Sequence, residues 1–420
     1  MAQGKLSRGV AVVGAGMTKF GSFRCKTSRE LFVTAFQEML ASVDKGVDPK
    51  QIEALFIGNF SSDLFETQSH TAPIMADWVG LTPRPAVRLE DACASSGVAL
   101  RQGILAVASG VYDMVLVGGI EKMTDLPGDK VTDALGIAAD TIYETSTGFT
   151  FPGFYASMAT AYMHAYGATP QTFMKVGMKN HENGSLNDKA QFGQRISAIM
   201  EARKASAVKK GLPMPTWQTE LDFLSDDRGN PMVAWPMRLF DCSPVSDGAA
   251  ALLLVSEELA RNFSDAPLHV IGSGQASDGA LHSRSTLTSI PAARAAAQEA
   301  YRMAGVTVND IQLAEVHDCF TIAEIIATED LGFFAPGAGG KAAEAGETAR
   351  TGSHPINTSG GLKSKGHPVG ASGAGQVNEI WKQLRGTAGE RQLPGNPSIG
   401  LTHNVGGTGQ TCTVHIFERR

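Results

Sequence analysis

The chain has few cysteines, and their spacing suits neither a metal ion nor a set of disulfides. The five cysteines among 420 residues (positions 25, 93, 242, 319 and 412) are odd in number, and none forms a CxxC pair. The ten histidines are scattered, with no HxxxH or HExxH. These absences argue against a disulfide framework and a zinc site, predict no bound metal, and favour a reducing compartment.

Long apolar runs and an excess of positive charge are also missing. No stretch reaches membrane-spanning length, and the start, MAQGKLSRGVAVVGAG, lacks the apolar core of a signal peptide, so we expect a cytoplasmic protein. The 36 basic residues against 42 acidic ones give a net charge of -6, which argues against nucleic acid or an anionic membrane as a partner. A hydrophobic content of 43% is enough to bury a sizeable core.

The clearest positive feature is an internal duplication, in which the first third of the chain resembles the last third. The first matched pair is GVAVVGAG and LHVIGSGQ, and in each an apolar strand runs into a Gly-x-Gly turn. Two further pairs of blocks follow in the same order. The matched ranges are 9–16 with 268–275, 46–60 with 305–320, and 96–110 with 372–386.

Strands rich in Val, Ile and Leu alternate with helical patterns in both copies, which predicts α/β halves with mixed or parallel sheets. We expect the two halves to pack as a pseudo-dimer. The N-terminal half would comprise residues 1–125 and 241–262, and the C-terminal half residues 263–420. Residues 126–240 are richer in Met, aromatic residues, Asn and Pro, and are predicted to form an inserted loop domain, a kind of insertion that is usually functional.

Cys93, in the segment VRLEDACASSG, lies where a strand-like run ends and a helix of small residues begins. A thiolate at a helix N-terminus gains from unpaired N–H groups and from the helix dipole, so its pKa falls and it becomes a better nucleophile. A small buried cysteine is the alternative at this position, because free cysteines are usually buried.

His367 occupies the matching place in the second copy, in GGLKSKGHPVGASGAG. Pro368 disfavours helical geometry in its predecessor and is itself suited to the first helical position, so His367 is predicted at the mouth of a helix. In a fold with pseudo-twofold symmetry, the mouths of the two equivalent helices can face one site. A histidine before proline is often only a turn residue, but the pairing with Cys93 through the duplication favours a site.

Two further motifs are candidates for the same site. The strand LAEVHDCF ends in HDCF, and its alternation places His317 and Cys319 on one side as a possible proton-transfer pair, with a core cysteine as the alternative. The turn HNVGGTG (403–409) has glycines that let the backbone present N–H groups to an oxyanion, although glycine-rich turns are common. The segment GAGMTKFG does not match a dinucleotide fingerprint, because Lys19 stands where the third glycine is needed.

Taken together, DACASS, SDGAAA (246–251), HDCF, NTSGGLKSKGHPVG and HNVGG resemble the thiolase superfamily in content, order and spacing, over essentially the whole chain. HDCF and HNVGG are most similar to the sterol-carrier-protein-2-type thiolases and the archaeal acetoacetyl-CoA thiolases. The resemblance implies a thiolase fold, in which two duplicated α/β halves with mixed five-stranded sheets pack as a pseudo-dimer and carry an inserted loop domain.

The resemblance also implies roles for the candidate residues. Cys93 would attack the thioester carbonyl of a 3-oxoacyl-CoA, and His367 would activate Cys93 and, with a water held near His317, stabilise the enolate oxygen. Commoner thiolases have a second catalytic cysteine in the turn where this chain has His403, so the proton transfer at the α-carbon is assigned to Cys319. The remaining expectations are backbone N–H donors at Cys93, Val405 and Gly406 for the oxyanion, and contacts of Met158 and Ser246 with coenzyme A.

By the same resemblance, coenzyme A and acyl-CoA are substrates, and no cofactor is tightly bound. The loop domain would bind the pantetheine and nucleotide of coenzyme A. A homodimer or tetramer is expected, and a small zinc-ribbon and OB-fold partner subunit is possible, as in relatives with HDCF and HNxGG. Acetoacetyl-CoA and bulkier compounds such as benzoylsuccinyl-CoA both remain open as substrates. So do two other functions: another acyl-CoA enzyme of this fold, a synthase or aldolase, and a non-catalytic acyl-CoA-binding subunit.

Overall fold

The computed structural model describes residues 4–420, and its elements follow the predicted duplication. The N-terminal half contains β1 (Val10–Met17), α1 (Ser28–Ala41), β2 (Ala54–Gly58), α2 (Ser62–Phe65), α3 (Thr71–Trp78), β3 (Ala86–Leu89), α4 (Ser95–Ala108), β4 (Met114–Glu121), β7 (Gly248–Ser256) and α10 (Glu257–Phe263). The C-terminal half contains β8 (Leu268–Ser277), α11 (Pro291–Ala304), β9 (Leu313–Glu315), α12 (Thr321–Asp330), α13 (Gly339–Ala345), α14 (Gly361–Ser364), α15 (Ser372–Leu384), β10 (Ile399–Gly406) and β11 (Thr411–Arg419).

The strands form one mixed sheet in the order β3-β2-β4-β7-β1-β8-β11-β10-β9. The order is nearly symmetric about the centre, where β1 and β8 pair antiparallel. On either side β7 and β11 are antiparallel to both of their neighbours, and the parallel pairs are β2 with β4, β2 with β3, and β10 with β9. The predicted α/β class is therefore confirmed. The two sheets join edge to edge, and within residues 4–420 the C-terminal half has four strands. An isolated parallel bridge, Ala314 to Ile356, lies where the fifth would be.

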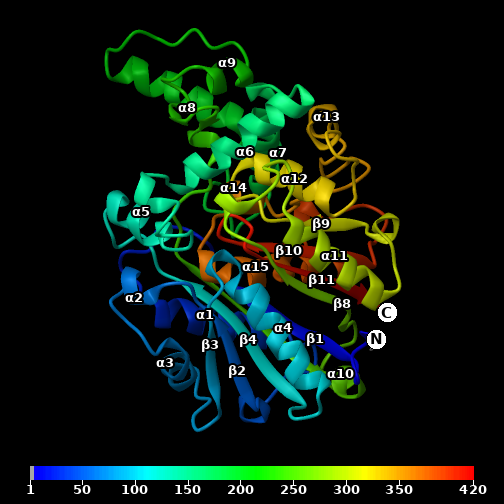
Figure 1. Cartoon of the computed structure of the whole chain (residues 1–420). Helices are drawn as coiled ribbons and strands as arrows, with labels where there is room; N and C mark the ends of the chain where they lie inside the picture. Colours follow the sequence, from blue (N-terminus) through cyan, green and yellow to red (C-terminus); the bar gives the residue numbers. More distant parts are fainter. Residues whose placement is uncertain (1–3) are drawn as a thin grey trace.

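Helices pack on both faces of the strands, because the strands are apolar on both sides. Along β7, Leu253 and Val255 belong to the core under α1 and α3, whereas Leu252 and Leu254 belong to the core under α4 and α15. The equivalent helices α4 and α15 contact strands of both halves, and α11 packs on the opposite face of β8 and β11. Figure 1 shows α4 and α15 between the two parts of the sheet.

The segment between β4 and β7 forms a mostly helical body at one end of the molecule (Figure 1, green). It carries a small core of its own, which includes Met200, Trp217 and Phe223. The predicted boundaries of this loop domain, 126–240, stay a prediction. Its elements are α5 (Gly128–Gly136), α6 (Phe151–Tyr166), α7 (Pro170–Gly184), α8 (Ile196–Lys209), α9 (Glu220–Ser225), β5 (Met232–Ala234) and β6 (Met237–Arg238).

Glycines allow α4 and α15 to cross closely at the pseudo-twofold axis. A Cβ added at Gly373 of α15 would lie 2.6 Å from the backbone nitrogen of Gly97 in α4 and 2.4 Å from the Oδ1 atom of Asn404. Both distances are too short for nonbonded atoms, so the helices would have to separate. The close crossing brings the N-termini of the two helices to one place.

The Gly373→Ala variant is therefore expected to lose about 1–3 kcal/mol of unfolding free energy to overpacking, less the ~1 kcal/mol that alanine gains in a helix. Urea unfolding followed by circular dichroism measures the difference. Gly136→Ala in α5 is the matched control, since its Cβ would meet nothing closer than 3.7 Å. Equal stability of the two variants would contradict the proposed tight crossing.

Candidate active site

Cys93 lies in a 3₁₀ turn (Ala92–Ala94) that leads directly into α4. Its neighbour Ala92 has φ +49°, in the left-handed region that residues other than glycine rarely adopt. The Ser95 hydroxyl holds this turn, because it donates to the Ala92 carbonyl at 2.6 Å and accepts the Asp91 N–H at 3.0 Å. Strained backbone of this kind is typical of residues that present a functional side chain.

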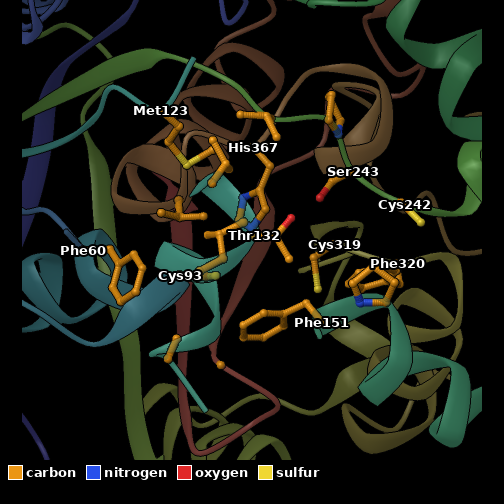
Figure 2. A pocket seen from close by; sticks show the side chains of 18 residues that line it. Phe60, Cys93, Met123, Thr132, Phe151, Cys242, Ser243, Cys319, Phe320 and His367 are labelled. Atoms are coloured by element: carbon orange, nitrogen blue, oxygen red, sulfur yellow. The ribbon is translucent and has the colours of Figure 1, made fainter. Parts of the chain in front are cut away.

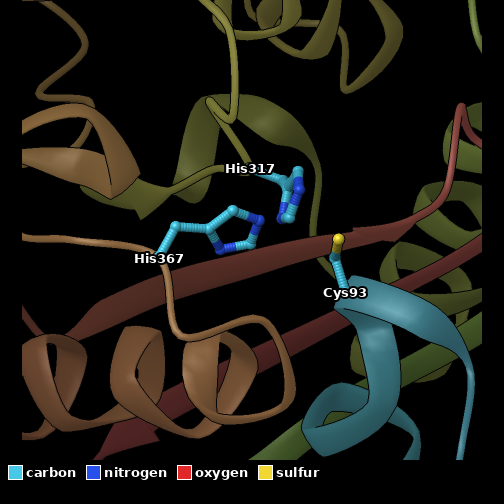
Figure 3. Close-up of side chains that lie close together, drawn as sticks. All are labelled: Cys93, His317 and His367. Carbon is cyan, nitrogen blue, oxygen red and sulfur yellow. The ribbon is translucent and has the colours of Figure 1, made fainter. Parts of the chain in front are cut away.

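The structure brings Cys93 together with the two histidines that the sequence singled out. The Cys93 sulfur and one ring nitrogen each of His317 and His367 all lie within 4.8 Å of one another, and all three side chains are buried (Figure 3). The two imidazole rings meet edge to face, with centroids 5.0 Å apart. His367 is not placed identically to Cys93: it precedes the equivalent turn (Val369–Ala371) and is separated from it by Pro368.

Hydrogen bonds define which nitrogen of His367 carries the proton. The Ser372 hydroxyl donates to the Pro368 carbonyl at 3.0 Å, so toward His367 Nδ1, 2.6 Å away, it acts as an acceptor. Nδ1 is therefore protonated, and Nε2 has the free lone pair of a base. The His367 backbone N–H in turn donates to the Ser246 hydroxyl at 2.8 Å.

His317 is the other tautomer, with its proton on Nε2 and not on Nδ1. The Asn404 side-chain amide nitrogen lies 3.0 Å from the Cys93 carbonyl and 3.1 Å from His317 Nδ1. Because this amide donates, Nδ1 accepts and the proton of His317 is on Nε2, a buried atom with no hydrogen-bond partner within residues 4–420. His317 thus supplies an N–H donor for an oxygen atom, whereas His367 supplies a base.

A cavity of about 180 Å³ opens beside Cys93, His367 and Cys319. Figure 2 shows the cysteine sulfurs and the His367 ring around it. One part of the wall is apolar and comes from α5 and its neighbours, and another comes from residues 242–245 and the start of α6. The full lining is Phe60, Cys93, Met123, Val131, Thr132, Leu135, Ala138, Phe151, Pro152, Cys242, Ser243, Pro244, Val245, Cys319, Phe320, His367, Val369 and Gly407.

Burial keeps the reactive groups neutral. It raises the pKa of the Cys93 thiol to about 12, although the Gly407 N–H acts to lower it. The lowered pKa expected for a cysteine at a helix N-terminus was therefore wrong, because burial outweighs that effect. Burial also lowers the pKa of His367 to about 3, with a further contribution from Lys365, and the pKa of His317 well below its usual value. Cys93 is therefore a thiol beside a neutral imidazole, so the thiolate forms only as His367 takes the proton.

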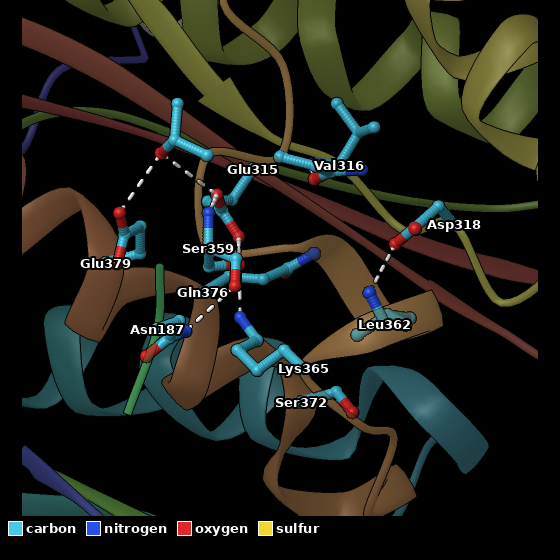
Figure 4. Close-up of polar contacts among 12 residues, drawn as sticks. Asn187, Glu315, Val316, Asp318, Ser359, Leu362, Lys365, Ser372, Gln376 and Glu379 are labelled. Atoms are coloured by element: carbon cyan, nitrogen blue, oxygen red, sulfur yellow. Dashed lines mark hydrogen bonds and ion pairs between the residues drawn. The ribbon is translucent and has the colours of Figure 1, made fainter. Parts of the chain in front are cut away.

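A buried network of charges holds the segment that carries His367 (Figure 4). Glu315, at the end of β9, accepts from the Ser359 N–H at 3.0 Å and pairs with Lys365 at 3.4 Å. Asp318 accepts the N–H of Leu362 at 2.6 Å. The motif HDCF and the segment from 357 to 365 are thus tied together, so the distance from His317 to His367 depends on this network.

The other predicted site residues, Met158, Ser246, Val405 and Gly406, do not line the cavity. Ser246 is buried and contacts the His367 backbone, whereas Met158 packs in the core around α6 and does not line the cavity. Val405 and Gly406 end β10, paired with Cys412 and Thr411. The N–H that bonds to the Cys93 sulfur belongs to the next residue, Gly407. Coenzyme A contacts at Met158 and Ser246, and N–H donors at Val405 and Gly406, stay predictions.

Three residues that position the reacting groups were not selected from the sequence. Asn404 and Gly407 both lie in the HNVGG motif, which was considered for its glycine backbone only. Ser372 lies five residues after His367, at the start of α15. A search for polar side chains within five residues of each candidate would have found Asn404 and Ser372; Gly407 required the structure.

Comparison with known proteins identifies the family. The model of the thiolase N-terminal domain matches residues 10–258, and that of a thiolase C-terminal domain-like family matches residues 273–419. The chain belongs to the thiolase family. It is therefore an acyltransferase of the thiolase class, as predicted, and thiolases use coenzyme A thioesters as substrates.

Two curated proteins are similar to this thiolase in sequence, and a solved structure is similar in fold. The chain is 44% identical to an acetyl-CoA acetyltransferase of Methanothermobacter thermautotrophicus, over 98% of this chain and 100% of that one. It is 29% identical to the benzoylsuccinyl-CoA thiolase subunit BbsB of Thauera aromatica, over 96% of each chain. The solved structure of an Ltp2-ChsH2(DUF35) aldolase matches with a TM-score of 0.78 and 24% identity over 98% of both chains, a likeness of fold. No helix in the described residues is long and apolar enough to span a membrane.

Removing the hydroxyl that orients His367 should slow this thiolase. In Ser372→Ala the Nδ1 proton loses its acceptor, so we expect kcat to fall roughly 10- to 100-fold with KM little changed. Steady-state thiolysis kinetics give both values. Ser256→Ala is the control, since it removes another buried hydroxyl that has no partner in the described residues. A Ser372→Ala enzyme with unchanged kcat would contradict the role in fixing the tautomer.

Proposed function

We propose that this thiolase cleaves a short 3-oxoacyl-CoA, acetoacetyl-CoA in the first instance, with coenzyme A, and catalyses the reverse condensation. The observation that carries the proposal is the grouping of the Cys93 sulfur with ring nitrogens of His317 and His367 within 4.8 Å, at the wall of a cavity that Cys319 also lines. The choice of acetoacetyl-CoA is supported by the relatives named acetyl-CoA acetyltransferase, at 44% and 41% identity.

The first step is the attack of Cys93 on a carbonyl. His367 Nε2 takes the thiol proton as the sulfur adds, because neither the thiolate nor the imidazolium is stable alone in this buried site. In the cleavage direction the carbonyl has to be the 3-oxo group and not the thioester expected from the sequence, since only addition at C3 lets C2 leave as an enolate. Backbone N–H groups near Cys93 and Gly407 are suited to the oxyanion.

The second step is proton transfer at C2. The His317 Nε2 proton is suited to the enolate oxygen, directly or through a water. Cys319 then gives its proton to C2, and the resulting thiolate takes a proton from the incoming coenzyme A thiol. The coenzyme A sulfur attacks the acyl group on Cys93, the Cys93 sulfur leaves, and His367 returns its proton. The cycle yields acetyl-CoA from the protonated enolate and the shortened acyl-CoA from the acyl group on Cys93, with every side chain restored.

A thiolysis assay tests the reaction class. Loss of the magnesium-enolate absorbance of acetoacetyl-CoA should depend on added coenzyme A, and mass spectrometry should find an acetyl group on the peptide that contains Cys93. Turnover without any acyl group on Cys93 would instead indicate an aldolase. Absence of turnover with any chain length would indicate a binding subunit, and a panel of acyl-CoAs would settle the substrate.

We further propose that the inserted segment binds coenzyme A and that the enzyme is a cytoplasmic homodimer or tetramer, with a small zinc-ribbon and OB-fold subunit as a partner. The partner is supported by a relative whose name describes a subunit and by a fold neighbour solved with a DUF35 protein. Purification from the native host should yield a second, small polypeptide. Repeated isolation of an active homo-oligomer alone would contradict the proposed partner subunit.

A further inference from the structure

Tyr155 lies behind the cavity wall and contacts two residues that form it. The side chain is fully buried on α6, and its ring stacks on Phe320 with centroids 4.6 Å apart. Its hydroxyl donates to the Gly407 carbonyl at 3.2 Å, and it lies close enough to the Cys319 side chain for each group to affect the pKa of the other. Tyr155 itself does not line the cavity, whereas Cys319 and Gly407 do.

Gly407 connects Tyr155 to the nucleophile as well. The residue has φ +60°, and a Cβ there would lie 2.7 Å from the Ala138 carbonyl oxygen, so glycine is required by both conformation and space. Its N–H hydrogen-bonds to the Cys93 sulfur. A single tyrosine hydroxyl therefore lies close to Cys319 and is linked to Cys93 through one residue.

The hydroxyl has one proton and two possible acceptors, the Gly407 carbonyl and the Cys319 sulfur. When Cys319 is a thiol, its S–H can donate to the tyrosine oxygen while the tyrosine proton stays on the Gly407 carbonyl. When Cys319 is a thiolate, the sulfur has no proton and becomes a charged acceptor. A hydrogen bond to a charged acceptor is about twice as strong as one to a neutral acceptor, so the tyrosine proton then prefers the sulfur.

We propose that Tyr155 is a positioning residue that stabilises the Cys319 thiolate by turning its O–H from the Gly407 carbonyl to the Cys319 sulfur. The inference rests on the proposed role of Cys319 at the α-carbon. No proton leaves Tyr155: the Cys319 S–H bond breaks, the C2–H bond forms, and only the direction of the tyrosine O–H changes. The reverse rotation follows when the thiolate is reprotonated by the coenzyme A thiol.

The site needs such a donor because its other features oppose the thiolate. Burial raises the pKa of Cys319 well above its usual value, and the nearby Cys93 and Asp318 raise it further. The Tyr155 hydroxyl and the Phe320 N–H act in the opposite direction. Tyr155 is thus the side chain that makes a charged Cys319 accessible in an apolar surrounding.

The Tyr155→Phe variant keeps the ring stacked on Phe320 and removes only the hydroxyl. The probe reaction is hydrogen exchange at the methyl group of acetyl-CoA in heavy water, with acetylation of Cys93 by acetyl-CoA measured in parallel. Exchange should fall roughly 10- to 100-fold while acetylation stays within about twofold, because the lost bond goes to a charged group used in one step only. The apparent pKa of Cys319, read from the pH dependence of the exchange rate, should rise by about one unit, because the thiolate has lost a hydrogen-bond donor.

Tyr162→Phe is the matched control on the same helix. Its hydroxyl is also buried and donates to Glu329 at 2.5 Å, but Tyr162 does not line the cavity and makes no hydrogen bond or ring contact with Cys319 or Gly407 within residues 4–420. This variant should lose stability and keep the ratio of exchange to acetylation. A Tyr155→Phe enzyme with unchanged exchange and an unchanged pH profile overturns the role of Tyr155 alone. A wild-type enzyme that neither exchanges hydrogen nor acetylates Cys93 overturns the proposed function with it.

Discussion

Cys93→Ala is expected to lower the rate of thiolysis by at least about 10⁴-fold, because the acyl-enzyme of a covalent mechanism cannot form without the Cys93 sulfur. The sulfur lies on the cavity wall, so its removal enlarges the cavity and leaves α4 and its N-terminal turn intact. The assay is thiolysis of acetoacetyl-CoA, and mass spectrometry checks that the acyl group is absent.

Cys25→Ala is the control for this variant, since Cys25 is an exposed free cysteine on another part of the chain. It should keep full activity and the acyl group on Cys93. Residual activity of Cys93→Ala within about tenfold of wild type would exclude the acyl-enzyme, a loss far smaller than removal of a covalent nucleophile produces. Cleavage would then have to proceed by a retro-aldol route.

The duplication made most of the fold predictable. An apolar strand followed by a Gly-x-Gly turn recurs as β1 and β8, and these two strands pair at the centre of the sheet. HDCF does bring Cys319 to the cavity and His317 to Cys93, but the predicted strand was too long: β9 ends at Glu315, and His317 and Cys319 lie beyond it. Strand alternation is therefore not what places these two side chains. The sequence could not predict that the two sheets are continuous, because that depends on pairing between β1 and β8.

Residues that act through geometry were harder to predict than residues that react. Asn404 contacts Cys93 and His317 from a strand more than 300 positions away from the nucleophile, a relation that only the crossing of the two halves creates. Tyr155 belongs to the inserted segment. This segment has no copy in the other half, so the duplication could not be used to predict which of its residues face the site. In both cases the residue type is common and its role follows from its contacts.

Cys319→Ala is expected to separate the two half-reactions. Transfer of the α-proton should slow by about 10²- to 10⁴-fold, the range that a positioned acid or base contributes, so cleavage of acetoacetyl-CoA should fall by the same factor. Acylation of Cys93 by acetyl-CoA needs no proton transfer at carbon and should continue. Hydrogen exchange in heavy water and mass spectrometry of the Cys93 peptide measure the two steps on one sample.

Cys412→Ala is the control that removes a buried sulfur without touching the cavity, because Cys412 lies on β11 and is absent from the lining. It should destabilise the enzyme and leave both steps at their wild-type ratio. A Cys319→Ala enzyme that keeps full carbon–carbon bond turnover would remove Cys319 from the mechanism. The proton would then have to come from another group that reaches C2, and His367, whose Nε2 becomes protonated when Cys93 attacks, is the described side chain with that capacity. Cys93 would keep its role in either case, since the acyl group and the α-proton are handled by different sulfurs.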